Sequence, residues 1–376
     1  MAYDGQLKTN LVFASLFNMI ISLQVFDTGI SDLDGIYQSR KVDGTLFGDT
    51  KLYISTDALK SYPWDGTDTP GSYNLLTIKR PPAPVQEAIT IDTFRQIPVT
   101  VDEYLTKQAF LDEGSFGSFN GVILAWLQTT KQVYEHTTYL ANIIVSAQAK
   151  ATSLGTVSLI PPAGVAGYDL IRWRAQELYR QIEDYMKELN EPSRSYNDHA
   201  FLRNYKLEDF DIVVPLGVLS SVRKHDIPFL YGPDDKPLFK EVHWKYFGTI
   251  DATGGTTDDD GTPVVVRRSL VEMDYTVGGT TTHVFPGDLI PDGATFAANV
   301  AYTPAYASRP SIGQDVTILM IHKQDYPIMS AFTVGTSFFN ARRLDINHYL
   351  TFGHNDVYDA HLGERALLKV TTDVAS

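Results

Sequence analysis

A long segment with apolar residues at helical spacing constrains this chain more than any other feature. From Ser118 to about Ala149, apolar side chains recur every three or four positions, and no proline or glycine interrupts them after Gly121. This spacing predicts one buried face of a helix, and a serine near its start can cap it. At ~1.5 Å per residue the helix would be roughly 45 Å long, longer than most helices of globular proteins. We therefore expect a stiff spine within an extended molecule.

The segment before the β-like region, residues 1–48, is predicted to be an N-terminal arm. It contains an apolar run at 11–26 with Ser15, Asn18, Ser22 and Gln24 inside it. A membrane-spanning helix needs ~20 consecutive apolar residues. We therefore interpret the run as an amphipathic helix that docks on protein, and we expect no membrane partner.

Residues 49–100 are predicted to form an extended β loop. β-like runs at 51–56 and 73–78 are separated by clusters of Gly and Pro, and an alternating run follows at 89–101. Alternation of this kind is typical of strands, and Gly and Pro mark the turns between them. A long β arm without its own core is expected to lie on another subunit.

The chain after the spine is predicted to be an α/β lobe. A second amphipathic helix is expected at about 168–189, and buried strands are expected at 210–214 and 316–321. Between these strands, residues 250–312 are rich in Gly, Thr and Asp, which indicates a β-rich insertion. Near its end the chain is predicted to form strands at 343–352 and 365–373, with a Gly-His-Asn-Asp turn between them at 353–356.

Composition excludes several kinds of chemistry. The chain has no cysteine, which rules out disulfides, thiolate metal sites and cysteine nucleophiles. Its formal net charge is −14, from 31 basic and 45 acidic residues. Tight DNA binding needs a basic face, because phosphate neutralisation supplies most of the affinity. This balance argues against a protein that grips DNA, although an acidic surface does favour solubility.

No catalytic or metal-binding motif is evident. The sequence lacks His-Glu-x-x-His and the Gly-x-Ser-x-Gly elbow, and Gly114–Gly117 has no lysine after it that would complete a phosphate loop. The cluster from His354 to His361 matches no common ligand spacing and is interpreted as a structural turn. The acidic run Asp258–Gly261 is interpreted as a solvated loop tip, because it lacks the spaced ligands of a calcium loop. We predict no catalytic residue, cofactor or metal.

The order of these elements resembles the Hong Kong 97-type major capsid fold of tailed phages. The Ile212-Val-Val-Pro215 strand with its following helix is similar to a step of that family's axial domain, and Tyr349–Tyr358 leading into Ala366–Val370 is similar to its closing strands. The resemblance implies an α+β fold. The domains it implies are an arm (1–48), an extended β loop (49–100), a peripheral domain with the spine helix (101–150), an axial domain (151–330) with the β-rich insertion, and peripheral closing strands (331–376).

If the resemblance holds, the chain is a major head protein that self-assembles, as pentamers and hexamers, into the icosahedral or prolate shell around phage double-stranded DNA. It further implies a separate scaffolding protein, a portal protein, DNA contacted without sequence recognition, and a virion assembled in the host cytoplasm. The candidate inter-subunit contacts are Phe13 and Phe17 in the arm, Trp64 and Tyr73 in the loop, and Arg267 and Arg268 in the insertion.

Three alternatives stay open at this point. An encapsulin-like compartment shell shares the fold and would be distinguished by a groove for cargo peptides. A cytosolic two-domain α/β enzyme would be a compact monomer or dimer with a clustered polar pocket. A portal or tail component is disfavoured, because the sequence lacks the pattern of a long helical stem with a wing.

Overall fold

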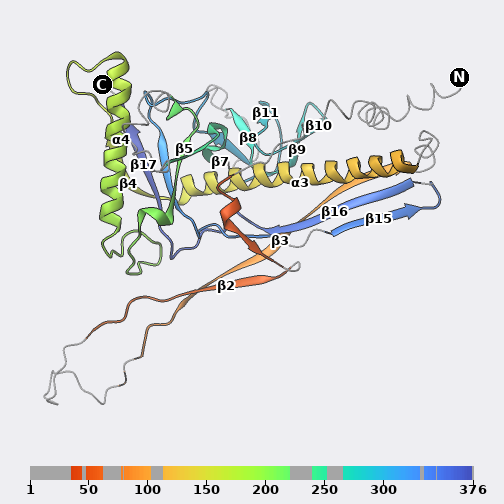
Figure 1. Ribbon diagram of the computed structural model, residues 1–376, viewed down its shortest axis with the longest axis horizontal. Helices are drawn as coiled ribbons and strands as arrows, with labels where there is room; N and C mark the ends of the chain where they lie inside the picture. The colour runs from red at the N-terminus through yellow and green to blue at the C-terminus, as the bar shows by residue number, and fades with distance from the viewer. Residues whose placement is uncertain are drawn as a thin grey trace. The chain divides into compact units, whose positions relative to one another are not determined.

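The computed structural model describes residues 35–44, 48–61, 78, 80–102, 113–220, 239–251, 266–330, 334–343 and 345–374 (Figure 1). The arm residues Phe13 and Phe17 and the loop residues Trp64 and Tyr73 lie outside these ranges. The chain divides into two compact units. Unit 1 comprises Met1–Gly35, Phe94–His136 and Phe332–Gly353, and unit 2 comprises Ile36–Thr93, Thr137–Ala331 and His354–Ser376.

The predicted spine is a single helix, α3, which runs from Glu113 to Lys150 and begins five residues before Ser118. Its last turns are buried almost all round, since Tyr139, Ile143 and Ile144 each have at most 1% of their surface exposed. A helix that is apolar on every side must lie inside a core. The C-terminal part of α3 therefore forms the centre of the larger core of unit 2.

A five-stranded sheet separates two cores in unit 2. Its order is β4-β17-β13-β5-β6, with β13 antiparallel to both β17 and β5. Alternate residues of the strands point to opposite faces. Val213 and Leu319 pack with α3, whereas Ile212 and Ile318 pack with the second helix, α4. The strand bounds are β4 Thr152–Ser158, β5 Phe210–Pro215, β6 Phe239–Val242, β13 Thr317–His322 and β17 Leu367–Asp373.

The helix predicted at 168–189 is α4, Gly167–Leu189. Its buried side chains follow the three-four spacing of the sequence: Ala175, Leu178, Ile182, Met186 and Leu189. On the opposite side, Arg180 pairs with Asp184 and Lys187 pairs with Glu183. Both this amphipathic helix and the predicted buried strands β5 and β13 are confirmed.

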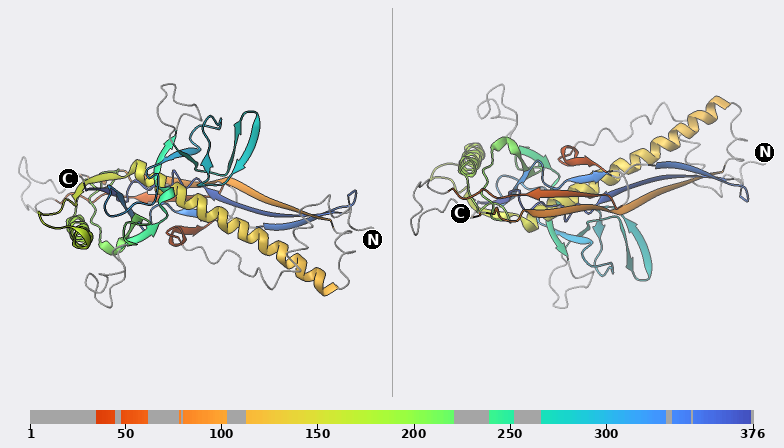
Figure 2. Two further views of the ribbon diagram at one scale, coloured as in Figure 1. Left: turned by 90° about the horizontal axis from the view of Figure 1, so that it is seen from above. Right: turned by 90° about the horizontal axis from the view of Figure 1, so that it is seen from below.

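The described part of the insertion is built entirely of short strands and turns. Four strands form a sheet in the order β11-β8-β12-β7, and β9 and β10 form a separate hairpin that Figure 2 shows as a twisted ribbon. Gly278 and Gly279 join β9 to β10 with φ of +56° and +83°, the left-handed values that a two-residue hairpin turn requires. The bounds are β7 Gly248–Asp251, β8 Arg267–Ser269, β9 Met273–Val277, β10 Thr280–Val284, β11 Leu289–Ile290 and β12 Ala301–Pro304.

The predicted β loop is an antiparallel hairpin of β2 and β3, which belongs to a sheet in the order β1-β14-β16-β3-β2 with β15 paired to β16. The strands are β1 Lys41–Asp43, β2 Thr50–Ser55, β3 Val85–Asp102, β14 Ile328–Ser330, β15 Val334–Asn340 and β16 Asp345–Asn355. Three short 3-10 helices, Gln38–Arg40, Leu207–Asp209 and Trp244–Tyr246, complete the described elements.

The turn predicted at 353–356 is wrong, because β16 continues through Asn355. The side chain of Asn355 is buried and accepts a hydrogen bond from Met329 N at 2.8 Å. Its amide also donates to the carbonyl of Pro327 at 3.2 Å. Asparagine here ties β16 to a neighbouring segment, a role that its local turn preference does not reveal.

Candidate assembly surfaces

One face of the sheet in unit 1 packs on the spine helix. Tyr134 of α3 meets Phe352 of β16 edge-to-face, with ring centroids 5.4 Å apart. The guanidinium of Arg95 lies 5.5 Å from the centroid of Tyr134, and the ammonium of Lys131 lies 5.6 Å from that of Phe352. Aromatic and cation–π contacts of this kind add to the apolar burial. This face is therefore occupied within the subunit.

The opposite face of the same sheet carries one charged side chain at its end, Asp345, which is paired with Asn340 and lies on the same side of β16 as Asn347. The described residues of this face beyond Asp345 are uncharged. Thr100 donates a hydrogen bond to Asn347 at 2.6 Å, and Gln96 donates to Thr351 at 3.3 Å, which fixes the register of β3 against β16. Phe338 of β15 stands opposite Asn347. We call this surface the unit 1 open face. It consists of Phe94, Gln96, Pro98, Thr100, Thr336, Phe338, Asn347, Tyr349 and Thr351.

Two large apolar side chains on the unit 1 open face are solvent-exposed. Phe94 is 42% exposed and Phe338 is 63% exposed. β15 pairs with β16, and no second partner strand is found for it in the part of the chain that the structure describes. An exposed edge strand with apolar side chains is a template for contact with another chain.

The hairpin of β2 and β3 has a second uncharged face. Directly paired residues lie on the same side of an antiparallel ladder, and the pairs here are Thr50 with Thr90, Leu52 with Ala88 and Ile54 with Gln86. Leu52 is 54% exposed and Ile54 is 58% exposed. We call these six residues the hairpin open face; Asp92, two positions after Thr90, ends its uncharged run.

The other side of the hairpin is held by later segments of unit 2, to which the paired part of the hairpin itself belongs. Glu87 accepts hydrogen bonds from the backbone of Gly363 at 2.9 Å and from His199 at 2.7 Å. At the end of β2, Asp57 accepts from Leu202 N at 2.9 Å and pairs with Arg194. The hydrogen bond from the Leu202 backbone, followed by that from Arg194, lowers the pKa of Asp57 to about 2. These contacts fix the base of the hairpin, and they all lie on the side opposite its uncharged face.

The two predicted arginines make contacts within their own chain. Arg267 pairs with Asp251. Arg268 donates to the carbonyl of Gly287 at 2.7 Å, and its guanidinium lies 5.8 Å from the centroid of the Trp244 ring. A role between subunits stays a prediction for both. Sequence reasoning missed Leu52, Ile54 and Phe338, although the uncharged residues at alternate positions of 86–100 are a signal that could have pointed to an open face.

The histidines of the cluster at 354–361 hold separate parts of the fold. His354 is buried, hydrogen-bonds the carbonyl of Asn355 at 2.7 Å and meets Tyr139 edge-to-face. His361 instead pairs with the buried Asp325 at 2.7 Å. Within the described ranges, no group of His, Asp and Glu has the arrangement of a metal site, and no described helix is long and apolar enough to cross a membrane.

Comparison with known proteins gives a consistent result. A sequence model of the family described as Phi29-like phage major capsid protein matches residues 4–232. A chain in the capsid structure of Staphylococcus phage Andhra is similar over 93% of this chain and 87% of its own, with 12% identity and a TM-score of 0.51. A chain in a structure of the head fibre and inner core protein of native bacteriophage P68 covers 93% and 88%, with 10% identity and a TM-score of 0.52. A search of curated proteins found no match.

Proposed function

Because the chain belongs to the family of Phi29-like phage major capsid proteins and is a major capsid protein of the phage head shell, we propose that its two uncharged open faces join neighbouring copies. The hairpin open face of one copy lies on the unit 1 open face of the next. The observation that carries this proposal is that none of the residues that make up the two faces is charged, although the net charge of the chain is −14 and Asp92 and Asp345 border the faces.

Charge explains why these faces suit contact between identical copies. Acidic subunits repel one another over their charged surfaces, and burying a charge without a partner is costly. An uncharged contact avoids both costs. Complete burial of a large apolar side chain contributes ~1.5–3 kcal/mol; because Leu52, Ile54, Phe94 and Phe338 are already about half buried, each would add about 1 kcal/mol. The contact is heterologous, and heterologous contacts close into rings when the rotation from one copy to the next closes.

The test replaces Leu52 and Ile54 with glutamine in one variant and Phe338 with glutamine in another. Both variants should remain folded by circular dichroism and should form few or no shells by electron microscopy. Tyr168→Gln provides a matched control, since Tyr168 is 46% exposed on α4 and belongs to neither face. Normal shells from either open-face variant would overturn the proposed contact.

The finer features of assembly are also proposals. Pentamers and hexamers close an icosahedral or prolate shell in the host cytoplasm, a separate scaffolding protein guides them, and a portal protein joins the shell. Phe13, Phe17, Trp64 and Tyr73 add contacts between copies. The packaged DNA is touched without sequence recognition, which the acidic charge supports, because tight phosphate binding needs clustered Lys and Arg. The role is structural and not catalytic. Co-expression with and without the scaffolding protein, followed by electron microscopy, tests this scheme.

A further inference from the structure

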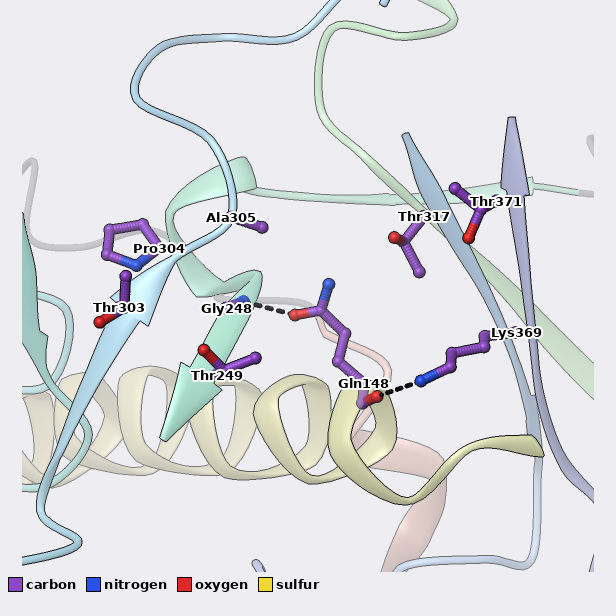
Figure 3. A pocket seen from close by; sticks show the side chains of 9 residues that line it. All are labelled: Gln148, Gly248, Thr249, Thr303, Pro304, Ala305, Thr317, Lys369 and Thr371. Atoms are coloured by element: carbon purple, nitrogen blue, oxygen red, sulfur yellow. Dashed lines mark hydrogen bonds between the residues drawn. The ribbon is translucent and has the colours of Figure 1, made fainter. Parts of the chain in front are cut away.

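A pocket of about 450 Å³ opens in unit 2 between the five-stranded sheet and the insertion (Figure 3); most of its surface is apolar, and several polar side chains lie within it. Its volume lies within the range of ordinary ligand pockets. The polar side chains that line it come from the end of α3, from β7 and β12 of the insertion, and from β13 and β17 of the sheet. They are Gln148, Thr249, Thr303, Thr317, Lys369 and Thr371.

Strand register explains why polar side chains gather here. Thr317 and Thr371 are directly paired across β13 and β17, and Lys369 lies on the same face two residues before Thr371. Farther along these strands, that face is covered by the core around α3, which contains Leu319. At this end the threonines and the lysine remain only partly covered, and they face the insertion across the pocket.

Hydrogen bonds fix which atoms point into the pocket. The side-chain oxygen of Gln148 accepts from the backbone N–H of Gly248. Its amide nitrogen therefore points toward the pocket, as Figure 3 shows. The ammonium of Lys369 donates to the backbone carbonyl of Gln148 at 2.9 Å, and two of its three protons remain for another acceptor. The pocket thus offers an amide N–H, an ammonium and several hydroxyl groups.

The electrostatics of the pocket favour a singly charged acid. No carboxylate lines it, and Lys369 has no ion-pair partner within the described part of the chain. The carboxyl end of α3 lies beside it and carries partial negative charge, which opposes a dianion such as phosphate. A carboxylate matches one ammonium in charge and accepts hydrogen bonds from all of the donors.

We propose that this pocket receives the carboxylate of an aspartate or glutamate side chain from a neighbouring copy in the shell. The inference rests on the proposed function, since it requires copies to meet. A second copy is the favoured source by charge complementarity, because each subunit carries 45 acidic and 31 basic residues and the pocket presents an unpaired cation.

The test is zero-length cross-linking in shells assembled from an equal mixture of nitrogen-14 and nitrogen-15 subunits. A water-soluble carbodiimide joins an amine to a carboxylate only when the two are in contact. Mass spectrometry should find Lys369 joined to an acidic residue in pairs that combine both isotopes, and free subunits should lack this product. Cross-links of Lys369 confined to one isotope, cross-links to a different protein, or an unreacted Lys369 in closed shells would each overturn the proposal.

Charge reversal gives a second readout. Lys369→Glu should lower the yield of shells by about tenfold or more, because two carboxylates would then meet in the pocket. Lys187→Glu, on the exposed side of α4, makes the same change in net charge away from the pocket and should leave the yield unchanged. Normal shells from Lys369→Glu would overturn the pocket proposal and leave the open-face contact standing.

Discussion

Arg40 and Asp211 form an ion pair in which both side chains are completely shielded from solvent, with 2.7 Å between Nη1 and Oδ2. Arg40 belongs to the short 3-10 helix just before β1, and Asp211 belongs to β5. The guanidinium also donates to the carbonyls of Ile36 at 2.5 Å and His322 at 3.3 Å. One side chain therefore attaches the segment before β1 to the central sheet of unit 2.

Arg40→Met removes the charge and both hydrogen bonds to backbone carbonyls while keeping an unbranched apolar side chain. Breaking a buried ion pair by removing one partner costs about 3–5 kcal/mol. Lys240 lies 2.7 Å from the other oxygen of Asp211 and is 47% exposed, so Asp211 keeps a partially solvated partner. We therefore expect a loss near the lower limit, about 3 kcal/mol. Asp211→Asn should cost more, because it leaves the buried Arg40 without a counter-charge.

The assay is urea unfolding of the free subunit followed by circular dichroism, in which the midpoint falls while the slope stays constant. A cycle with the double variant Arg40→Met/Asp211→Asn isolates the coupling, which should be about 2 kcal/mol or more between two groups in contact. Lys187→Met on the exposed side of α4 is the control and should lower the midpoint only slightly, because its exposed pair with Glu183 contributes little. A loss below about 1 kcal/mol for Arg40→Met, or additive single losses, would refute the reasoning, since a shielded pair must be coupled.

Three further predictions concern acid, base and backbone geometry. Burial, with the charge of Arg365, lowers the pKa of His322 to about 4, whereas the pKa of histidine in an unfolded chain is near 6.5. The free energy of unfolding should therefore fall by up to ~3 kcal/mol as the pH drops from about 6.5 to 4. A His322→Gln variant that keeps the full acid sensitivity would contradict this origin. Burial alone would lower the pKa of His361, but the hydrogen bond to Asp325 raises it. The stability that this pair contributes is complete below about pH 6.5 and is lost as the pH rises through the higher pKa of the folded state. Asp325→Asn should therefore remove the dependence of the free energy of unfolding on pH between neutral and mildly alkaline values, and an unchanged dependence would disprove the pairing. Gly217 has φ of +118°, and an added Cβ would collide with the carbonyl of Pro310, so Gly217→Ala should lower the free energy of unfolding in urea by more than about 2 kcal/mol. Gly278 has φ of +56° and open space around it, so Gly278→Ala should cost only about 1 kcal/mol. Equal losses would refute the steric argument.

Elements whose evidence is local were predictable from the sequence. The three-four spacing of α3 and α4 and the apolar run of β5 each report burial within a single segment. The hairpin of β2 and β3 followed from alternation and turn residues. The order of these elements along the chain was also enough to indicate the capsid fold that the comparisons support.

Features that depend on distant pairing were not predictable. Gly353–Asp356 has the composition of a turn, yet the side chain of Asn355 forms hydrogen bonds with the backbone of Met329 and Pro327, which lie more than twenty positions earlier. The β17 strand pairs with β4 and β13, and no local pattern names those partners. The open faces depend on register, because a shift of one residue in β3 would exchange its exposed and covered sides.

The pocket was invisible to the sequence for the same reason. Gln148, Thr249 and Lys369 lie in three segments that are more than a hundred positions apart. None of them belongs to a recognisable motif. Only the packing of the insertion against the sheet brings their donors together, within unit 2.

Cryo-electron microscopy of shells assembled from the purified protein and its scaffolding protein tests the central claim most directly. The account predicts closed shells in which Leu52 and Ile54 of one copy lie on Phe94 and Phe338 of its neighbour, with both faces shielded from solvent. A protein that stays a monomer or dimer under all assembly conditions would contradict the account. Shells in which the two open faces remain exposed would also contradict it.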